Sequence, residues 1–158
     1  MVRPRLVLLV LLAAFMAVQV PKAAQARDIY CQAHPVDDAL RPLPGSLVPQ
    51  AMRLFGLRDM PASQVQRTTV IRCMGGRLWA CNYGANLPCG KANTSHVPAP
   101  GAGVWCEDNP EVDFIPAYIT GHDGIYDWGC RGGVPVITGP PAPVDARGFL
   151  STYWKLIR

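Results

Sequence analysis

The first long apolar stretch of the chain runs from Leu6 to Val20 and is interrupted only by Gln19. Two arginines precede it, and Ala24-Gln25-Ala26 follows it with the small residues that a signal peptidase accepts. A membrane-spanning helix needs about 20 apolar residues, so this run is short for one. The pattern predicts a signal peptide over residues 1–26 that is cleaved after Ala26. An uncleaved membrane anchor is the alternative.

Beyond the leader, apolar positions recur in two short periodic patterns. Between Ser46 and Phe55 they recur at spacings of three and four, which predicts a helix that Gly56 ends. The β-branched residues of 68–73 predict a strand, and Met74-Gly75-Gly76 predicts a turn after it. Residues 77–81 then run back as the second strand of a hairpin.

Glycines and prolines divide the second half of the chain into further short strands. Residues 117–120, 125–130 and 134–137 predict three of them, with a turn at 121–124 between the first two. Pro135 confines the last strand to a sheet edge, because proline cannot donate a ladder hydrogen bond.

Loops and helices surround these strands. Residues 84–104 are rich in Pro and Gly and predict a long loop, which a disulfide at Cys89 would hold. A single helical turn is predicted over 111–114, just after a proline. Beyond the Pro-rich stretch 139–143, Asp145 predicts the start of a final helix. The apolar residues of that helix share one stripe: Phe149, Leu150, Tyr153, Trp154 and Ile157.

These elements predict an α+β fold, with a small antiparallel β-sheet of hairpins flanked by two short helices. It should be disulfide-stapled and loop-rich. We expect residues 27–60 to form an extended arm and a short helix, and residues 61–158 to form the disulfide-stapled α+β domain. The processed chain is long enough to bury a hydrophobic core.

Six cysteines lie beyond the predicted leader: Cys31, Cys73, Cys81, Cys89, Cys106 and Cys130. An even number in an exported chain predicts disulfides, whose connectivity does not follow from spacing. We favour Cys81–Cys89 as a local staple. Zinc binding is the alternative, but no C-x-x-C pair occurs and exported thiols tend to oxidise. We expect no metal and no cofactor.

Charge argues against nucleic acid as a partner. The full chain carries 15 basic and 11 acidic residues, but three basic residues leave with the leader, so the processed chain has a net charge of only +1. Its basic residues are scattered singly, whereas nucleic-acid binding needs a concentrated basic face. We also expect no membrane span once the leader is removed.

His122-Asp123 is the strongest candidate for chemistry. An imidazole beside a carboxylate can serve as a general base with its orienting partner, or as a metal-ligand pair. Gly-x-Asp-Gly is also turn chemistry, in which Asp bonds its own backbone. No G-x-S-x-G elbow supplies a nucleophile, and Ser95-His96 fits a solvated loop. A turn is the preferred interpretation, and a small hydrolase using His122 and Asp123 is the alternative.

Acidic residues are concentrated just before the predicted strands: Glu107, Asp108, Glu111 and Asp113. Their oxygens could attract Ca²⁺, but the spacing does not match an EF-hand loop. Acidic residues near a helix start are already explained by the helix dipole.

Two segments carry a family resemblance: Arg72–Asn93 (RCMGGRLWACNYGANLPCGKAN) and Thr120–Cys130 (TGHDGIYDWGC). With Asp113–Pro116 and Asp145–Phe149, they resemble a group of small exported proteins of Gram-negative bacteria. The resemblance covers residues 68–155. It implies a periplasmic or secreted protein with no established enzyme activity, and it supplies no catalytic residues.

The run Trp128–Gly133 partly resembles the aromatic-x-Cys-x-x-Gly hairpin of periplasmic lysozyme-inhibitor proteins. This weaker likeness implies lysozyme inhibition as a further alternative, although the Ser-Gly inhibitory loop of those proteins is not identified in this chain.

The expected function is binding. We expect a non-enzymatic periplasmic or secreted protein that recognises a protein or cell-envelope component through loop 84–104 and turn 121–124, because loops on a rigid scaffold usually carry recognition. The candidate binding residues are Lys91, Trp105, His122, Asp123 and Tyr126.

Overall fold

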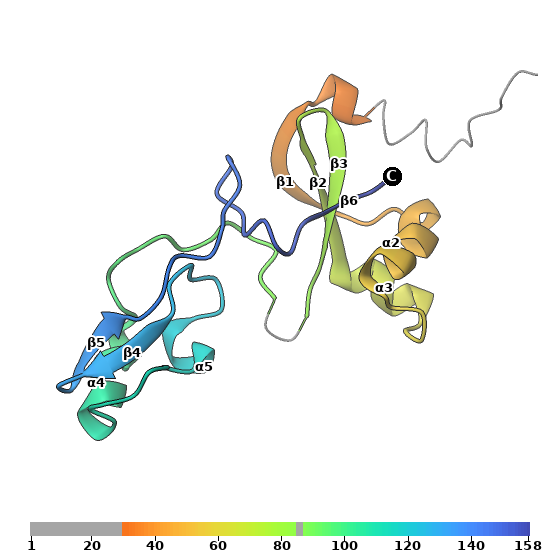
Figure 1. Ribbon diagram of the computed structural model, residues 1–158. Coiled ribbons are helices and arrows are strands. Elements are labelled where there is room, and N and C mark those ends of the chain that lie inside the picture. Colours follow the sequence, from red (N-terminus) through yellow and green to blue (C-terminus); the bar gives the residue numbers. More distant parts are fainter. Residues whose placement is uncertain (1–29, 85–86) are drawn as a thin grey trace, which may run out of the picture.

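The computed structural model describes residues 30–84 and 87–158, so the predicted signal peptide lies outside the described residues. The chain forms two lobes joined into an elongated molecule (Figure 1). The first lobe holds a four-stranded sheet with helices beside it, and the second holds a β-hairpin with two helices. The fold is therefore a small α+β fold stapled by disulfides, as the sequence predicts.

The sheet of the first lobe is antiparallel and runs in the order β1-β2-β3-β6: Val36–Pro42, Thr69–Met74, Arg77–Asn82 and Lys155–Leu156. The predicted hairpin is confirmed as β2 and β3. Gly75 and Gly76 turn it with φ of 59° and 69°, a region that glycine enters without steric cost. The stretch expected as an extended arm contains β1, which pairs with β2 and lengthens the sheet.

Three short helical elements pack beside this sheet: the 3-10 turn Gly45–Leu47, α2 (Val48–Phe55) and α3 (Ala62–Thr68). The predicted helix is confirmed as α2, and Gly56 ends it with φ of 70°. The helix α3 was not predicted, because Val65 is its one buried residue and its sequence carries no apolar stripe.

The core of the first lobe lies between these helices and the sheet. Its buried residues include Leu43, Leu47, Ala51, Val65, Ile71, Leu78 and Ile157. The Cys31–Cys73 disulfide is fully buried in this core and joins β2 to the chain before β1. Cys31, near the start of the described residues, and Ile157, near the end of the chain, therefore share one core.

The second lobe consists of α4, α5 and the hairpin β4-β5: Pro100–Asp108, Ala117–Thr120, Trp128–Arg131 and Val134–Ile137. Its core is small and is built from Ala102, Cys106, Ile115, Trp128 and Cys130. The Cys106–Cys130 disulfide joins α4 to β4 across it.

Several predictions for this lobe are wrong. Residues 117–120 form α5 instead of a strand, because Pro116 starts a helical turn that local β-propensity does not anticipate. Residues 100–104, predicted as loop, form the N-terminal part of α4. Residues 111–114 form no helical turn and instead contact the edge of β4. The strand predicted over 125–130 is shorter and begins only at Trp128.

The predicted final helix is also wrong. Asp145 Oδ1 accepts hydrogen bonds from the backbone N–H groups of Arg147 and Phe149, at 2.8 and 3.2 Å, which closes a tight turn. Gly148 then has φ of 84°, a conformation that no helix continues. Four of the five residues of the predicted stripe are still buried, but on an irregular segment: Phe149, Leu150, Trp154 and Ile157.

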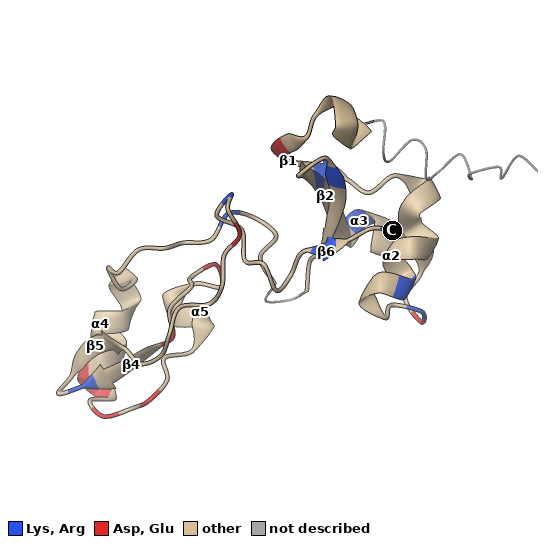
Figure 2. Ribbon diagram, turned by 45° about the horizontal axis from the view of Figure 1, so that its top comes forward, with Lys and Arg blue, Asp and Glu red and all other residues tan. Residues whose placement is uncertain are grey.

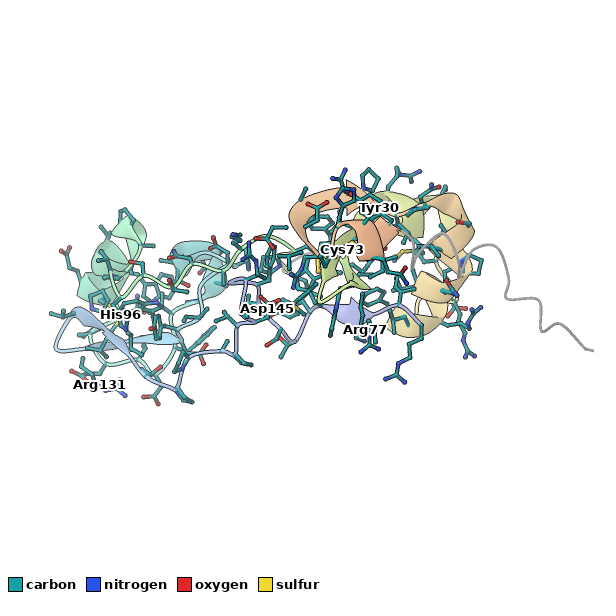
Figure 3. All side chains as sticks on the ribbon, turned by 90° about the horizontal axis from the view of Figure 1, so that it is seen from above. Tyr30, Cys73, Arg77, His96, Arg131 and Asp145 are labelled. Atoms are coloured by element: carbon teal, nitrogen blue, oxygen red, sulfur yellow. A yellow bond between two sulfur atoms is a disulfide. The ribbon has the colours of Figure 1, made fainter. Side chains whose placement is uncertain are left out.

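This C-terminal segment closes over a buried cation. Arg72 on β2 is 1% exposed, and its guanidinium carbon lies 4.0 Å from the ring centre of Phe149 and 4.5 Å from that of Trp154. Its Nη2 donates to Oδ2 of Asp145. Figure 3 shows Asp145 between the two lobes. The ion pair therefore holds the segment that returns from the second lobe against the sheet of the first.

The disulfide Cys81–Cys89 is confirmed as the predicted local staple. It joins β3 to the connection between the lobes and packs with Phe149 and Trp154. Three buried disulfides are compatible with an oxidising, extracytoplasmic environment. Within the described residues, no helix has the length and apolar character that crossing a bilayer requires.

Gly129 in β4 allows a close backbone approach that no larger residue permits. A Cβ at this position would lie 2.6 Å from the carbonyl oxygen of Val112 and 2.7 Å from Cγ2 of Thr138. We expect Gly129→Ala to lower the free energy of unfolding by about 1–3 kcal/mol, measured by urea denaturation. Gly139→Ala is the control, because its Cβ would meet its nearest neighbour, Asp127, at 3.7 Å. Equal stability of the two variants would contradict the prediction.

Asp37 in β1 should make the first lobe sensitive to acid. Hydrogen bonds from Arg41 first, then from the Ala39 amide and the Tyr30 hydroxyl, lower the pKa of Asp37 to about 2. A depressed pKa stabilises the folded state above the ordinary pKa of 3.8, and this contribution is lost as the pH falls from there to about 2.

We therefore expect Asp37→Asn to flatten the dependence of the urea midpoint on pH between about 4 and 2. Arg41→Ala should have an intermediate effect, because the Tyr30 and Ala39 donors remain. A wild-type slope in Asp37→Asn would show that this carboxylate does not contribute.

Candidate functional site

The two segments singled out as a binding surface lie side by side in the second lobe. The Asn93 N–H donates to the carbonyl oxygen of Asp123 at 2.7 Å, and the Ile125 N–H donates to that of Asn93 at 3.1 Å. These bonds form a parallel bridge between Asn93 and Gly124. The bridge therefore holds Asn93, in the loop that follows Cys89, beside the 121–124 turn.

A side-chain contact joins the same two segments. The Tyr126 hydroxyl and His96 Nε2 are 2.8 Å apart, and the two ring centres are separated by 4.6 Å. His96 is exposed and Tyr126 is half-buried, so the imidazole covers one part of the tyrosine ring. Figure 3 shows His96 within the second lobe. Sequence reasoning assigned Ser95-His96 to a solvated loop, because no local pattern signals a partner 30 residues away.

Two adjacent hollows surround Tyr126, and they share the lining residues Thr120, Gly124, Tyr126 and Trp128. The first hollow has a volume of about 270 Å³ and also includes Phe114, His122, Asp127 and Tyr153. The second has a volume of about 310 Å³ and is completed by Asn93, Ser95 and residues 97–100. We call the surface formed by both hollows the Tyr126 site.

His122 and Asp123 do not face the same part of the surface. Both side chains are exposed, but only the His122 side chain lines the first hollow. In the described part of the chain, no hydrogen bond joins the His122 imidazole to the Asp123 carboxylate. Gly121 has φ of 94°, consistent with the turn interpretation. The arrangement of a base with its orienting carboxylate, as the hydrolase alternative requires, is not formed here.

Lys91 lies outside the Tyr126 site, in a charged cluster where the lobes meet. Lys91 Nζ is 3.1 Å and Arg147 Nη2 is 2.8 Å from Oδ2 of Asp38. Hydrogen bonds from Arg147, and then from Lys91, lower the pKa of Asp38. Figure 2 shows basic and acidic segments next to each other at this junction. Lys91 therefore has a structural partner.

Trp105 is also outside the two hollows. It lies on α4, half-buried, and its ring contacts that of Tyr118 edge to face at a centroid distance of 6.1 Å. Tyr118 is 71% exposed, so this aromatic pair forms a separate part of the lobe surface.

The acidic residues near the hairpin support its turn. Glu111 accepts a hydrogen bond from the Gly132 N–H at 2.6 Å, and Asp113 pairs with Arg131. Among residues 30–84 and 87–158, no group of three His, Cys, Asp or Glu side chains could hold a metal ion. These carboxylates therefore have local partners in the fold.

Two larger hollows lie on the first lobe and are less suited to specific recognition. One, of about 580 Å³, is lined mainly by apolar side chains such as Phe55, Met60 and Leu87. The other, of about 520 Å³, is a wide, open depression beside β6 and α2. The Tyr126 site is the better candidate because loop 93–100 and turn 121–124, the two kinds of segment that usually carry recognition, meet there.

No known protein family matches the chain, and no curated protein or solved structure was found to match it.

Proposed function

We propose that the protein is an exported binding module that recognises a protein or cell-envelope component through the Tyr126 site. The observation that carries the proposal is the convergence of loop 93–100 and turn 121–124 on one aromatic residue. Binding sites commonly combine an apolar wall with a few polar groups, and both are present around Tyr126.

The supporting scaffold favours recognition by a preformed surface. The Asn93–Gly124 bridge holds the two segments together, and the Cys106–Cys130 disulfide braces the elements behind them. A surface that is already ordered loses less conformational entropy when it binds. The predicted leader and the three disulfides support a site of action outside the cytoplasm.

Affinity capture with matched variants tests this function. The processed chain with a C-terminal tag would be incubated with periplasmic extract and with solubilised envelope. We expect Tyr126→Ala to recover at least tenfold less of any specific partner than the wild type, because truncating an aromatic anchor removes most of its contact area. Tyr118→Ala is the control, since Tyr118 is an exposed tyrosine of the same lobe that lines neither hollow.

Equal recovery of partners by Tyr126→Ala and the wild type would reject the Tyr126 site. A loss that is equally large in Tyr118→Ala would mean that the lobe surface in general, and not this site, determines capture. Circular dichroism of both variants would show that each remains folded.

A further inference from the structure

The first hollow of the Tyr126 site has aromatic walls. Phe114, Tyr126 and Tyr153 line it together with Trp128. Phe114 is 59% exposed, whereas Trp128 is 8% exposed and belongs to the core. An exposed aromatic ring beside a hollow offers a flat apolar face to a ligand at little cost in conformational entropy.

Polar groups in the same hollow are available to a ligand. In the described part of the chain, no hydrogen bond occupies the His122 imidazole, the Thr120 hydroxyl or the Asp127 carboxylate. A neutral imidazole and a hydroxyl can each donate and accept, and a carboxylate accepts only. Among residues 30–84 and 87–158, no lysine or arginine lines either hollow, so these residues offer an anionic ligand no basic countercharge.

This chemistry fits a neutral sugar. A sugar ring presents C–H bonds on its faces, which can stack on aromatic rings, and hydroxyl groups around its edge, which both donate and accept hydrogen bonds. The two hollows lie near the lower end of the usual size range of ligand sites, about 300 Å³. We propose that the Tyr126 site binds a neutral oligosaccharide. This ligand class rests on the binding function proposed above.

The ligand should span more than one ring. Tyr126 lines both hollows, so one sugar unit in each would contact the same side chain. The second hollow adds the polar residues Asn93 and Ser95. Affinity should therefore rise from a monosaccharide to a tetrasaccharide.

A proline-rich peptide is the main competing ligand, because aromatic-lined grooves also bind such chains. Proline residues offer carbonyl acceptors but no backbone N–H donors. Asp127 needs a donor from the ligand, and the Tyr126 hydroxyl, which could donate to a carbonyl, is already paired with His96 at 2.8 Å. The oligosaccharide is therefore the better match.

Nuclear magnetic resonance titration of the processed, ¹⁵N-labelled chain tests the ligand class. The probes are tetra-N-acetylchitotetraose, maltotetraose and decaproline. We expect at least one tetrasaccharide to cause saturable shifts of the Trp128 indole and the Gly124 amide. Phe114→Ala and Asp127→Asn should each weaken that binding about tenfold, the loss expected for one aromatic contact or one charged hydrogen bond. Val134→Ala should bind as the wild type does, because Val134 is 58% exposed and lines neither hollow.

No saturable shift with either tetrasaccharide at millimolar concentration would overturn the oligosaccharide assignment. Shifts of the same residues by decaproline alone would overturn it in favour of a peptide ligand. In both cases the proposed binding function would still stand if Tyr126→Ala lost its captured partner and Tyr118→Ala kept it. Equal capture by all variants would instead reject that function.

Discussion

Replacing Asp145 with alanine should lower the free energy of unfolding by about 3–5 kcal/mol, the usual cost of leaving a buried ion without its partner. Arg72 is 1% exposed, and Asp145 is its anionic partner. Its other polar contact is a weak one to Met74 Sδ at 3.8 Å, and its Nε has no hydrogen-bond partner among the described residues. The aromatic rings over the guanidinium cannot replace a carboxylate. Urea denaturation followed by tryptophan fluorescence would measure the loss.

Asp145 has a second role, so the charge must be tested separately. Its Oδ1 accepts the N–H groups of Arg147 and Phe149, and an asparagine oxygen can keep these bonds. Asp145→Asn therefore isolates the loss of charge. The double variant Arg72→Met with Asp145→Asn removes both charges and should be more stable than the sum of the single losses predicts. Strictly additive losses would show that the pair does not act as an ion pair.

The parts of the fold that sequence reasoning predicted are those specified by neighbouring residues. The β2-β3 hairpin follows from β-branched residues around Gly75-Gly76, and α2 follows from a local apolar periodicity. The Cys81–Cys89 disulfide closes a loop with a sequence separation of only 8, so proximity alone favours it. Each of these features can be predicted from nearby residues without knowledge of the rest of the chain.

The features that were missed depend on contacts between distant residues. The Arg72–Asp145 pair spans 73 positions, and it draws the C-terminal segment into a turn where its own apolar stripe favours a helix. The Tyr126 site also depends on contacts between residues that are distant in the sequence. The loop and the turn were each identified from local composition, but their pairing through His96 and Tyr126 requires the tertiary fold.

Replacing both Cys106 and Cys130 with alanine should unfold the second lobe while the first remains folded. In the chain-entropy description, a loop of this length contributes about 3–4 kcal/mol. The two cysteines are also two of the five residues that form the buried core of this lobe. A lobe with so small a core has little else to offset its conformational entropy. We expect the amide signals of β4 and β5 to lose their dispersion and those of β2 and β3 to keep it.

Two matched pairs of substitutions show whether the effect is specific. Cys81→Ala with Cys89→Ala opens a shorter loop, so it should cost about 2.5 kcal/mol and leave both lobes folded. Cys31→Ala with Cys73→Ala should destabilise the first lobe, whose larger core also includes Leu43, Val65 and Leu78. If losing Cys106–Cys130 unfolded both lobes together, they would form a single cooperative unit. Because the Tyr126 site lies wholly on the second lobe apart from Tyr153, ligand binding should disappear with that lobe's structure.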